Sequence, residues 1–118
     1  MKYLFLLYGP AGPLPEPGSE EFTDMVQRWS AATGAMAQAG VLIDCAPVEP
    51  VEASTTLRVR DGEVMLTDGP AAEIKEHFGG FTLVECASLD EALKWAATLP
   101  AASDGSIEIR PVVHVERG

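Results

Sequence analysis

The first apolar segment of the chain, residues 2–8, is hydrophobic at both odd and even positions. Apolar side chains on both faces of a strand are typical of the centre of a sheet. Residues 81–86 show a similar apolar run and predict a second central strand. Two further strands are predicted over residues 41–48, which end in prolines that suit an edge position, and over residues 106–115, where isoleucine alternates with charge.

Two amphipathic helices are expected between these strands. Ser19 is the candidate N-cap of the first helix, which has acidic residues in its first turn, and Gly40 closes it. The expected buried face of this helix contains Phe22, Met25, Val26, Trp29, Thr33, Met36 and Ala37. A capping box at Ser88 opens the second helix, which Pro100 stops. Its expected buried stripe contains Leu89, Ala92, Leu93, Ala96 and Leu99.

A β-hairpin is predicted over residues 55–67, because Asp61 and Gly62 lie between two alternating runs. In the expected register, apolar pairs share one face and polar pairs share the other. The pairs are Val59 with Val64, Leu57 with Leu66, Arg60 with Glu63 and Thr56 with Thr67. A short helix is predicted next over residues 71–78, between Pro70 and a pair of glycines.

Without the hairpin and the short helix, the element order is β-α-β followed by β-α-β, the ferredoxin-like arrangement of an α+β fold in one domain, residues 1–118. Two helices cover only one face of a four-stranded sheet, although its central strands are apolar on both faces. We therefore expect a homodimer whose sheets pack face to face, with a cavity between sheet and helices or at the shared interface. A monomer whose far face is covered by the hairpin is the alternative.

Charge and composition narrow the possible partners. Eight basic and eighteen acidic residues give a formal net charge of −10, spread along the chain, which disfavours nucleic acid. No apolar run approaches the roughly 20 residues that span a bilayer, and the opening apolar run is too short for a signal peptide. We expect a cytoplasmic protein with no membrane partner. Two cysteines and two distant histidines predict neither a disulfide scaffold nor a metal site, and no cofactor is expected.

Five residues are candidates for a functional site. The Asp68 carboxylate is expected either to accept backbone N–H bonds at a helix start or, beside an apolar cavity, to lose hydration and act as a general base. His77 either interacts with carbonyls at the end of the short helix or is the acid partner. Tyr8, Trp29 and Phe81 are candidate ligand-binding residues, with core packing as the alternative for the tryptophan and the tyrosine.

Several segments resemble the DGPF-type branch of the YCII-related family, and the resemblance covers nearly the whole chain. They are Met1 to Gly9, Ala39-Gly40-Val41, Asp68-Gly69-Pro70, Glu73, Lys75-Glu76, Gly79-Gly80-Phe81, Ser88-Leu89-Asp90-Glu91-Ala92-Leu93, Trp95-Ala96 and Glu108-Ile109-Arg110-Pro111-Val112. The resemblance implies a ferredoxin-like fold of the dimeric α+β barrel kind. The DGPF branch has no settled activity, and its members often resemble accessory proteins encoded near extracytoplasmic-function sigma factors.

The sequence departs from the family pattern at two places. Ala71 stands where the DGPF motif has an aromatic residue, and residues 19–39 contain no histidine, so the histidine–aspartate dyad of the related lyase-like branch does not carry over. Asp68 is the only acid whose motif position the resemblance singles out. The leading hypothesis is a homodimer that binds a small, mostly apolar molecule in a barrel cavity, as a cofactor-independent lyase or isomerase acting through Asp68. The second hypothesis is a non-catalytic accessory or regulatory protein linked to such a sigma factor.

Overall fold

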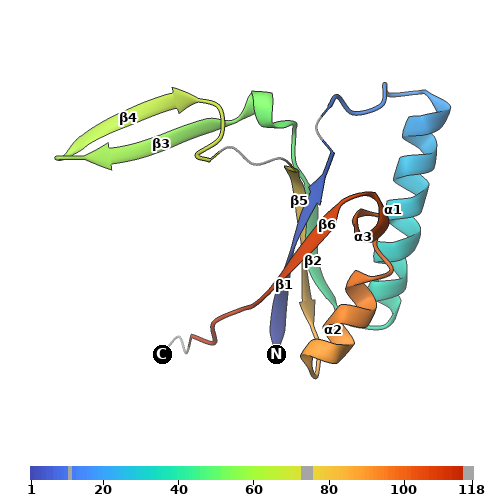
Figure 1. Cartoon of the computed structure of the whole chain (residues 1–118). Coiled ribbons are helices and arrows are strands. Elements are labelled where there is room, and N and C mark those ends of the chain that lie inside the picture. Colours follow the sequence, from blue (N-terminus) through green and yellow to red (C-terminus); the bar gives the residue numbers. More distant parts are fainter. Residues whose placement is uncertain (11, 73–75, 116–118) are drawn as a thin grey trace.

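The computed structural model of the 118-residue chain describes residues 1–10, 12–72 and 76–115 (Figure 1). The strands are β1 (Lys2–Gly9), β2 (Leu42–Pro47), β3 (Thr55–Arg60), β4 (Glu63–Asp68), β5 (His77–Glu85) and β6 (Ser106–Pro111). The helices are α1 (Glu20–Gln38), α2 (Leu89–Ala96), α3 (Ala101–Asp104) and a single 3₁₀ turn, η1 (Val51–Ala53). None of the helices in these ranges is both long and apolar enough to cross a membrane.

Four strands form an antiparallel sheet in the order β2-β5-β1-β6. The two strands that are apolar on both faces, β1 and β5, are central, and the proline-ended β2 lies at an edge, as predicted. Together with α1 and α2 this order is the ferredoxin-like arrangement, and the predicted α+β fold is confirmed.

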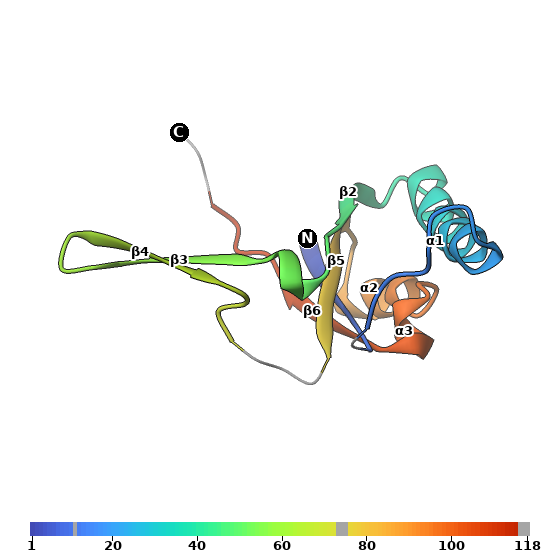
Figure 2. The ribbon, with the colours of Figure 1, turned by 90° about the horizontal axis from the view of Figure 1, so that it is seen from above.

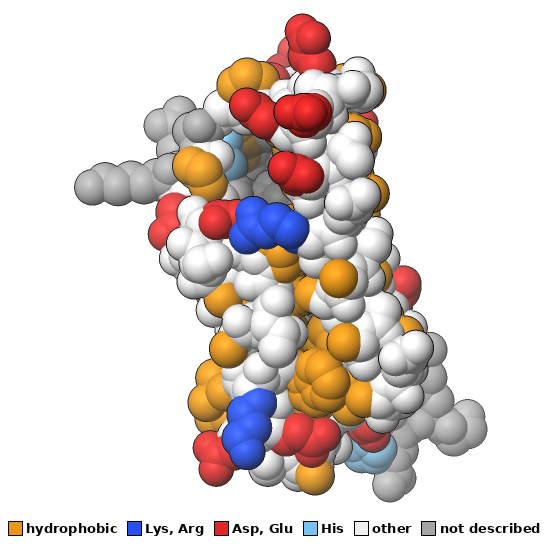
Figure 3. Space-filling view, turned by 90° about the vertical axis from the view of Figure 1, so that its right-hand side faces the viewer, with side chains coloured by type: hydrophobic (Ala, Val, Ile, Leu, Met, Phe, Trp, Pro, Cys, Tyr) orange, Lys and Arg blue, Asp and Glu red, His pale blue; other side chains and the backbone are white. Residues whose placement is uncertain are grey.

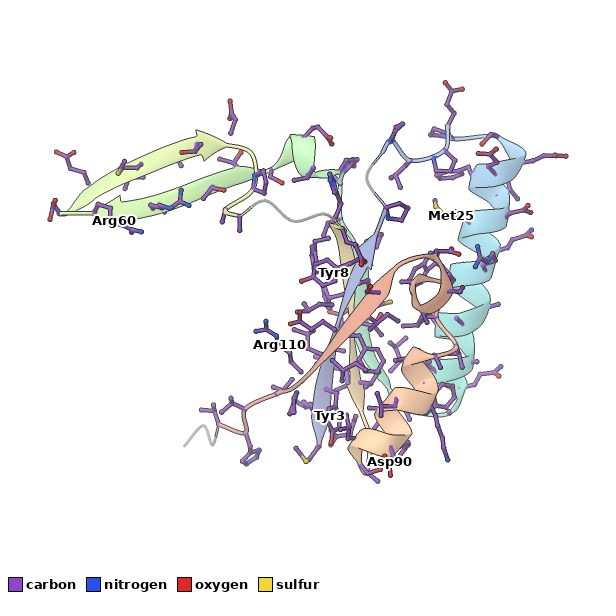
Figure 4. All side chains as sticks on the ribbon, in the orientation of Figure 1. Tyr3, Tyr8, Met25, Arg60, Asp90 and Arg110 are labelled. Carbon is purple, nitrogen blue, oxygen red and sulfur yellow. The ribbon has the colours of Figure 1, made fainter. Side chains whose placement is uncertain are left out.

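The α-helices α1, α2 and α3 cover the same face of the sheet (Figures 1 and 2). The core lies between the sheet and the helices, where Tyr3, Phe5 and Leu7 of β1 and Val84 of β5 are buried. Figure 4 shows Met25 pointing from α1 toward the sheet. The covered face is therefore an ordinary two-layer core.

Both predicted helix starts are confirmed by capping hydrogen bonds. The Ser19 Oγ accepts from the Phe22 N–H at 3.1 Å, and the Ser88 Oγ accepts from the Glu91 N–H at 3.2 Å. The Glu91 carboxylate in turn accepts from the Ala87 N–H at 2.9 Å. The two serine bonds satisfy N–H groups that a helix start leaves without intrahelical partners, and the Glu91 bond fixes the residue before the cap.

The predicted buried stripes are correct only in part. Val26 of α1 is 44% exposed, and Leu89 and Leu93 of α2 are 48% and 47% exposed, whereas Ala92 and Ala96 are buried. The eight-residue helix α2 buries its alanines, whereas its leucines lie outside the buried stripe. Helical spacing identifies a set of neighbouring positions but does not identify which side of that set faces the core.

The predicted hairpin is confirmed in every pair of its register, with a two-residue turn at Asp61 and Gly62, both at positive φ. β3 and β4 form a separate two-stranded sheet, which we call the arm. The arm projects from the side of the four-stranded sheet that carries no helices (Figures 1 and 2). The alternative in which the hairpin covers its own sheet is therefore wrong for the chain as described.

The predicted short helix over residues 71–78 is wrong where it can be judged. Residues 73–75 lie outside the described residues, whereas His77 and Phe78 belong to β5 because they pair with the end of β1. The glycines that were expected to end this helix lie inside β5. A Cβ on Gly80 would approach the Ala46 carbonyl oxygen to 2.5 Å, so this glycine permits the close approach of β2.

Candidate functional site

The face of the sheet without helices is apolar along both central strands. The register places Leu4 beside Leu83, Leu6 beside Phe81 and Tyr8 beside Phe78, alternating with the buried side chains of the core. We call this surface, made by Leu4, Leu6, Tyr8, Phe78, Phe81 and Leu83, the open face. Its edges are polar, with Asp44 from β2 on one side and Glu108 and Arg110 from β6 on the other. Figure 4 shows Arg110 pointing toward this side of the sheet.

A depression of about 340 Å³ lies at the edge of the open face, where β1 ends and β6 begins. It is lined by Tyr8, Glu76, Ser106, Ile107 and Glu108, and we call it the edge pocket. The Tyr8 ring also packs edge-on against Phe78, with ring centroids 5.7 Å apart. The pocket therefore adjoins an aromatic pair on one side and carboxylates on the other.

Glu76 gives the edge pocket its chemistry. Its Oε1 accepts a hydrogen bond from the Ser106 hydroxyl at 2.8 Å, while its Oε2 is buried without a hydrogen-bond partner among the described residues. A buried carboxylate oxygen without a partner is costly, so the site favours a molecule that supplies a donor. Glu108 is already paired with the Arg110 guanidinium and is less available.

A second depression, of about 440 Å³, lies between the helices on the opposite side of the molecule (Figure 3). It is lined by three alanines, Ala31, Ala32 and Ala97, together with Arg28, Thr98, Leu99, Pro100 and Ser103. The Arg28 guanidinium at this groove pairs with Asp104 at 3.2 Å. With its one charged lining residue paired, the groove offers less binding chemistry than the edge pocket. Neither depression is a closed cavity between the sheet and the helices.

The five candidate residues do not form one cluster in the chain. Tyr8 lines the edge pocket, and Phe81 lies further along the open face. Trp29 is half-buried on α1 and packs against the core on the other side of the sheet. His77 is half-buried at the start of β5 opposite Gly9, not at the end of a helix.

Asp68 ends β4 and is exposed at the base of the arm, opposite Thr55. Neither setting expected for it, a helix start or a cavity wall, occurs in the described residues. The motif around it closes the arm instead: the Gly69 N–H donates to the Ser54 carbonyl at 2.8 Å, and the Thr56 hydroxyl donates to the Gly69 carbonyl at 2.6 Å. Gly69 has a φ of 106°, which few other residues adopt.

Sequence reasoning missed the polar residues of the edge pocket. Glu108 alternates with the isoleucines of β6, so the pattern alone places it on the side away from the helices. Ser106 and Glu76 gave no comparable signal, because they meet only through the tertiary arrangement of β1, β5 and β6. Within the described ranges, no group of three or more His, Cys, Asp or Glu is placed to hold a metal ion.

Comparison with known proteins confirms the YCII-related family. The model of the YCII-related domain matches residues 1–116. The uncharacterized protein R00369 of Rhizobium meliloti (strain 1021) is 39% identical over 120 residues, covering all of this chain and 97% of that protein. The structure of 5-chloro-2-hydroxyhydroquinone dehydrochlorinase (TftG) from Burkholderia phenoliruptrix AC1100, in complex with 2,5-dihydroxybenzoquinone, aligns at 16% identity and a TM-score of 0.49, over 98% of this chain and 96% of that one. The chain belongs to the YCII-related domain family.

Proposed function

We propose that this chain forms a homodimer through its open face and binds a small, mostly apolar molecule that bears a hydrogen-bond donor in the edge pocket. The observation that carries the binding proposal is the buried Oε2 of Glu76, which has no hydrogen-bond partner among the described residues and lies in a pocket shared with the Tyr8 ring. The carboxylate would accept the donor of the ligand, and the aromatic pair beside it would contact the apolar part. The motif from Asp68 to Pro70 supports placement in the DGPF branch of the family.

The homodimer is supported by the distribution of apolar and polar side chains on the open face. Its centre consists of leucines and aromatic residues that are only partly buried in the single chain, and its edges carry charge. An apolar centre with a polar rim is the usual composition of a stable protein interface. A two-fold arrangement places the same surface on both copies and needs no other partner.

The catalytic part of the proposal is a cofactor-independent lyase or isomerase in which Asp68 is the general base and His77 the acid partner. These two residues begin and end the connection between the arm and β5. Asp68 shares its side of the arm with Leu57 and Leu66, so cover on that side would remove water from its carboxylate.

A non-catalytic accessory protein is the second candidate. The exposure of Asp68 in the single chain favours it, since an exposed carboxylate lacks the dry surroundings that proton abstraction requires. Loss of a turnover reaction in Asp68→Asn would support the enzyme, whereas unchanged ligand binding and no turnover in the wild type would support the accessory role.

The binding proposal is tested by calorimetric titration with phenol as the probe and toluene as the probe without a donor. We expect phenol to bind the wild type more tightly than toluene, and Glu76→Gln to weaken phenol binding about tenfold, because a hydrogen bond to a charged group is lost. Tyr8→Phe tests the contribution of the tyrosine hydroxyl in the same pocket. Glu52→Gln, an exposed acid on η1, is the control and should leave binding unchanged.

The dimer is tested separately by sedimentation equilibrium. Leu6→Lys places a charge in the centre of the open face and should produce a monomer at micromolar concentration. Leu93→Lys places the same charge on an exposed leucine of α2 and should leave the dimer intact. A wild type that sediments as a monomer, or a Leu6→Lys variant that remains a dimer, refutes the proposed interface.

A further inference from the structure

The arm leaves its apolar side uncovered. Leu57, Val59, Val64 and Leu66 share this side, and each is between 52% and 66% exposed. The arm touches its own chain through the other side, where the Thr56 hydroxyl bonds to Gly69 and the Arg58 guanidinium donates to the Ala71 carbonyl at 3.4 Å. The apolar side is therefore turned away from the described segment to which these hydrogen bonds connect the arm.

A two-stranded arm of this kind is stable only when another surface packs against its apolar side. An isolated two-stranded hairpin is only marginally stable in water. The arm shares no strand pairing with the four-stranded sheet. It also extends the molecule, whose radius of gyration is 16.4 Å, where a single domain of this length would have about 13 to 14 Å.

The position and the length of the arm indicate that a second copy of this chain covers its apolar side. The arm projects from the same side of the sheet as the open face (Figures 1 and 2), so a copy docked on the open face meets the arm as well. Each strand of the arm has six residues, a length of about 20 Å at ~3.4 Å per residue. Four strands spaced by about 4.8 Å occupy about 14 Å, so the arm can cross the sheet of a partner.

Charge argues against other occupants. Residues 55–68 hold two arginines against three acids, so the arm contributes one of the ten net negative charges of the chain. The overall charge of −10 works against nucleic acid and against an anionic membrane surface as alternatives.

We infer that the arm is exchanged between two copies, each burying its apolar side, made by Leu57, Val59, Val64 and Leu66, against the other. This inference rests on the proposed homodimer and extends its interface beyond the open face. Each copy then contributes two surfaces to the assembly, and the two-fold axis repeats both.

The test compares two neighbouring residues of β4 that lie on opposite sides of the arm. Leu66→Lys charges the apolar side, and Met65→Lys charges the side that faces Arg58. The two side chains are 66% and 52% exposed in the single chain, so both substitutions are surface changes in a monomer. Sedimentation equilibrium measures the dimer dissociation constant of each. We expect Leu66→Lys to raise it about a hundredfold, because two arms change at once, and Met65→Lys to change it less than about threefold.

Hydrogen exchange on the wild type provides a second readout that no substitution can distort. Amides of residues 57–66 should become more protected as protein concentration rises through the dissociation constant. Equal dissociation constants for both variants, or arm amides that exchange freely in a wild-type dimer, overturn the arm inference. If Leu6→Lys still breaks that dimer, the proposed homodimer stands without the arm. A monomeric wild type overturns both.

Discussion

Helices cover one face of the four-stranded sheet and leave the other open, although the same strands supply both faces. Along β1, Tyr3, Phe5 and Leu7 are at most 8% exposed beneath the helices, whereas the intervening Leu4 and Leu6 remain partly open to solvent. Both sets are apolar, so the side chains themselves do not distinguish the faces. The difference lies in how many helices the chain supplies, which is enough for one face only. An apolar strand face without cover in its own chain is therefore evidence for a partner.

The largest expected effect is on the free energy of unfolding, which substitutions on the two faces of the sheet should lower to different extents. Phe5→Ala removes a fully buried ring from the covered face and should lower the free energy of unfolding by about 3–5 kcal/mol at any protein concentration. Leu6→Ala, its neighbour on the open face, should cost less at concentrations where the chain is monomeric and more where it is dimeric. Urea unfolding at two protein concentrations measures both. Similar, concentration-independent losses for the two variants would contradict the difference in cover.

The two cysteines show a similar contrast in their reactivity. Cys86 is 3% exposed beneath the helices and Cys45 is exposed on the edge strand β2. Burial, with the nearby Glu91 carboxylate, raises the pKa of the Cys86 thiol above its ordinary value of 9.0. Iodoacetamide at pH 8 should therefore label Cys45 in the folded protein, and Cys86 only at the rate at which the core opens.

The raised pKa of Cys86 also predicts the direction of a pH effect. The folded state holds the thiol proton more tightly than the unfolded state, whose thiol ionises near pH 9.0, so unfolding is favoured as pH rises through that value. The free energy of unfolding should fall between pH 8 and pH 10, by less than the Phe5 substitution costs, and part of this fall should be absent in Cys86→Ala. An unchanged pH dependence in that variant would show that other groups account for it.

The ferredoxin-like order was predictable because its signals are local. Ser19 and Ser88 carry the side chains that cap helices, and the turn at Asp61 and Gly62 sets the hairpin register without reference to the remainder of the fold. The start of β5 was not predictable, because His77 and Phe78 become strand only by pairing with the end of β1, far away in sequence. Local propensity there was overridden by a tertiary contact.

The candidate site was predictable to a similar degree. Tyr8 and Phe81 were recognised as candidates on apolar central strands, and both lie on the open face, while their role in ligand binding stays a prediction. Glu76 and Ser106 were not, because their hydrogen bond joins residues thirty positions apart. Asp68 was singled out by a motif, and in the single chain that motif closes the arm. The proposed role of Asp68 as a general base requires cover from the proposed second copy, which spacing within one chain does not describe.

The smallest expected effect tests a position where helical spacing and the structure disagree. Leu93 has the spacing of a buried residue but is 47% exposed, so Leu93→Lys should change the free energy of unfolding by no more than about 0.5 kcal/mol. Ala92, its neighbour, is fully buried. Ala92→Leu should lower the free energy of unfolding by about 1–3 kcal/mol, because the larger side chain overpacks the core between α2 and the sheet. Urea unfolding of the two variants in parallel compares them directly. A large loss from Leu93→Lys would mean that α2 lies closer to the sheet than its exposed leucines indicate, and that the covered face extends further along this helix.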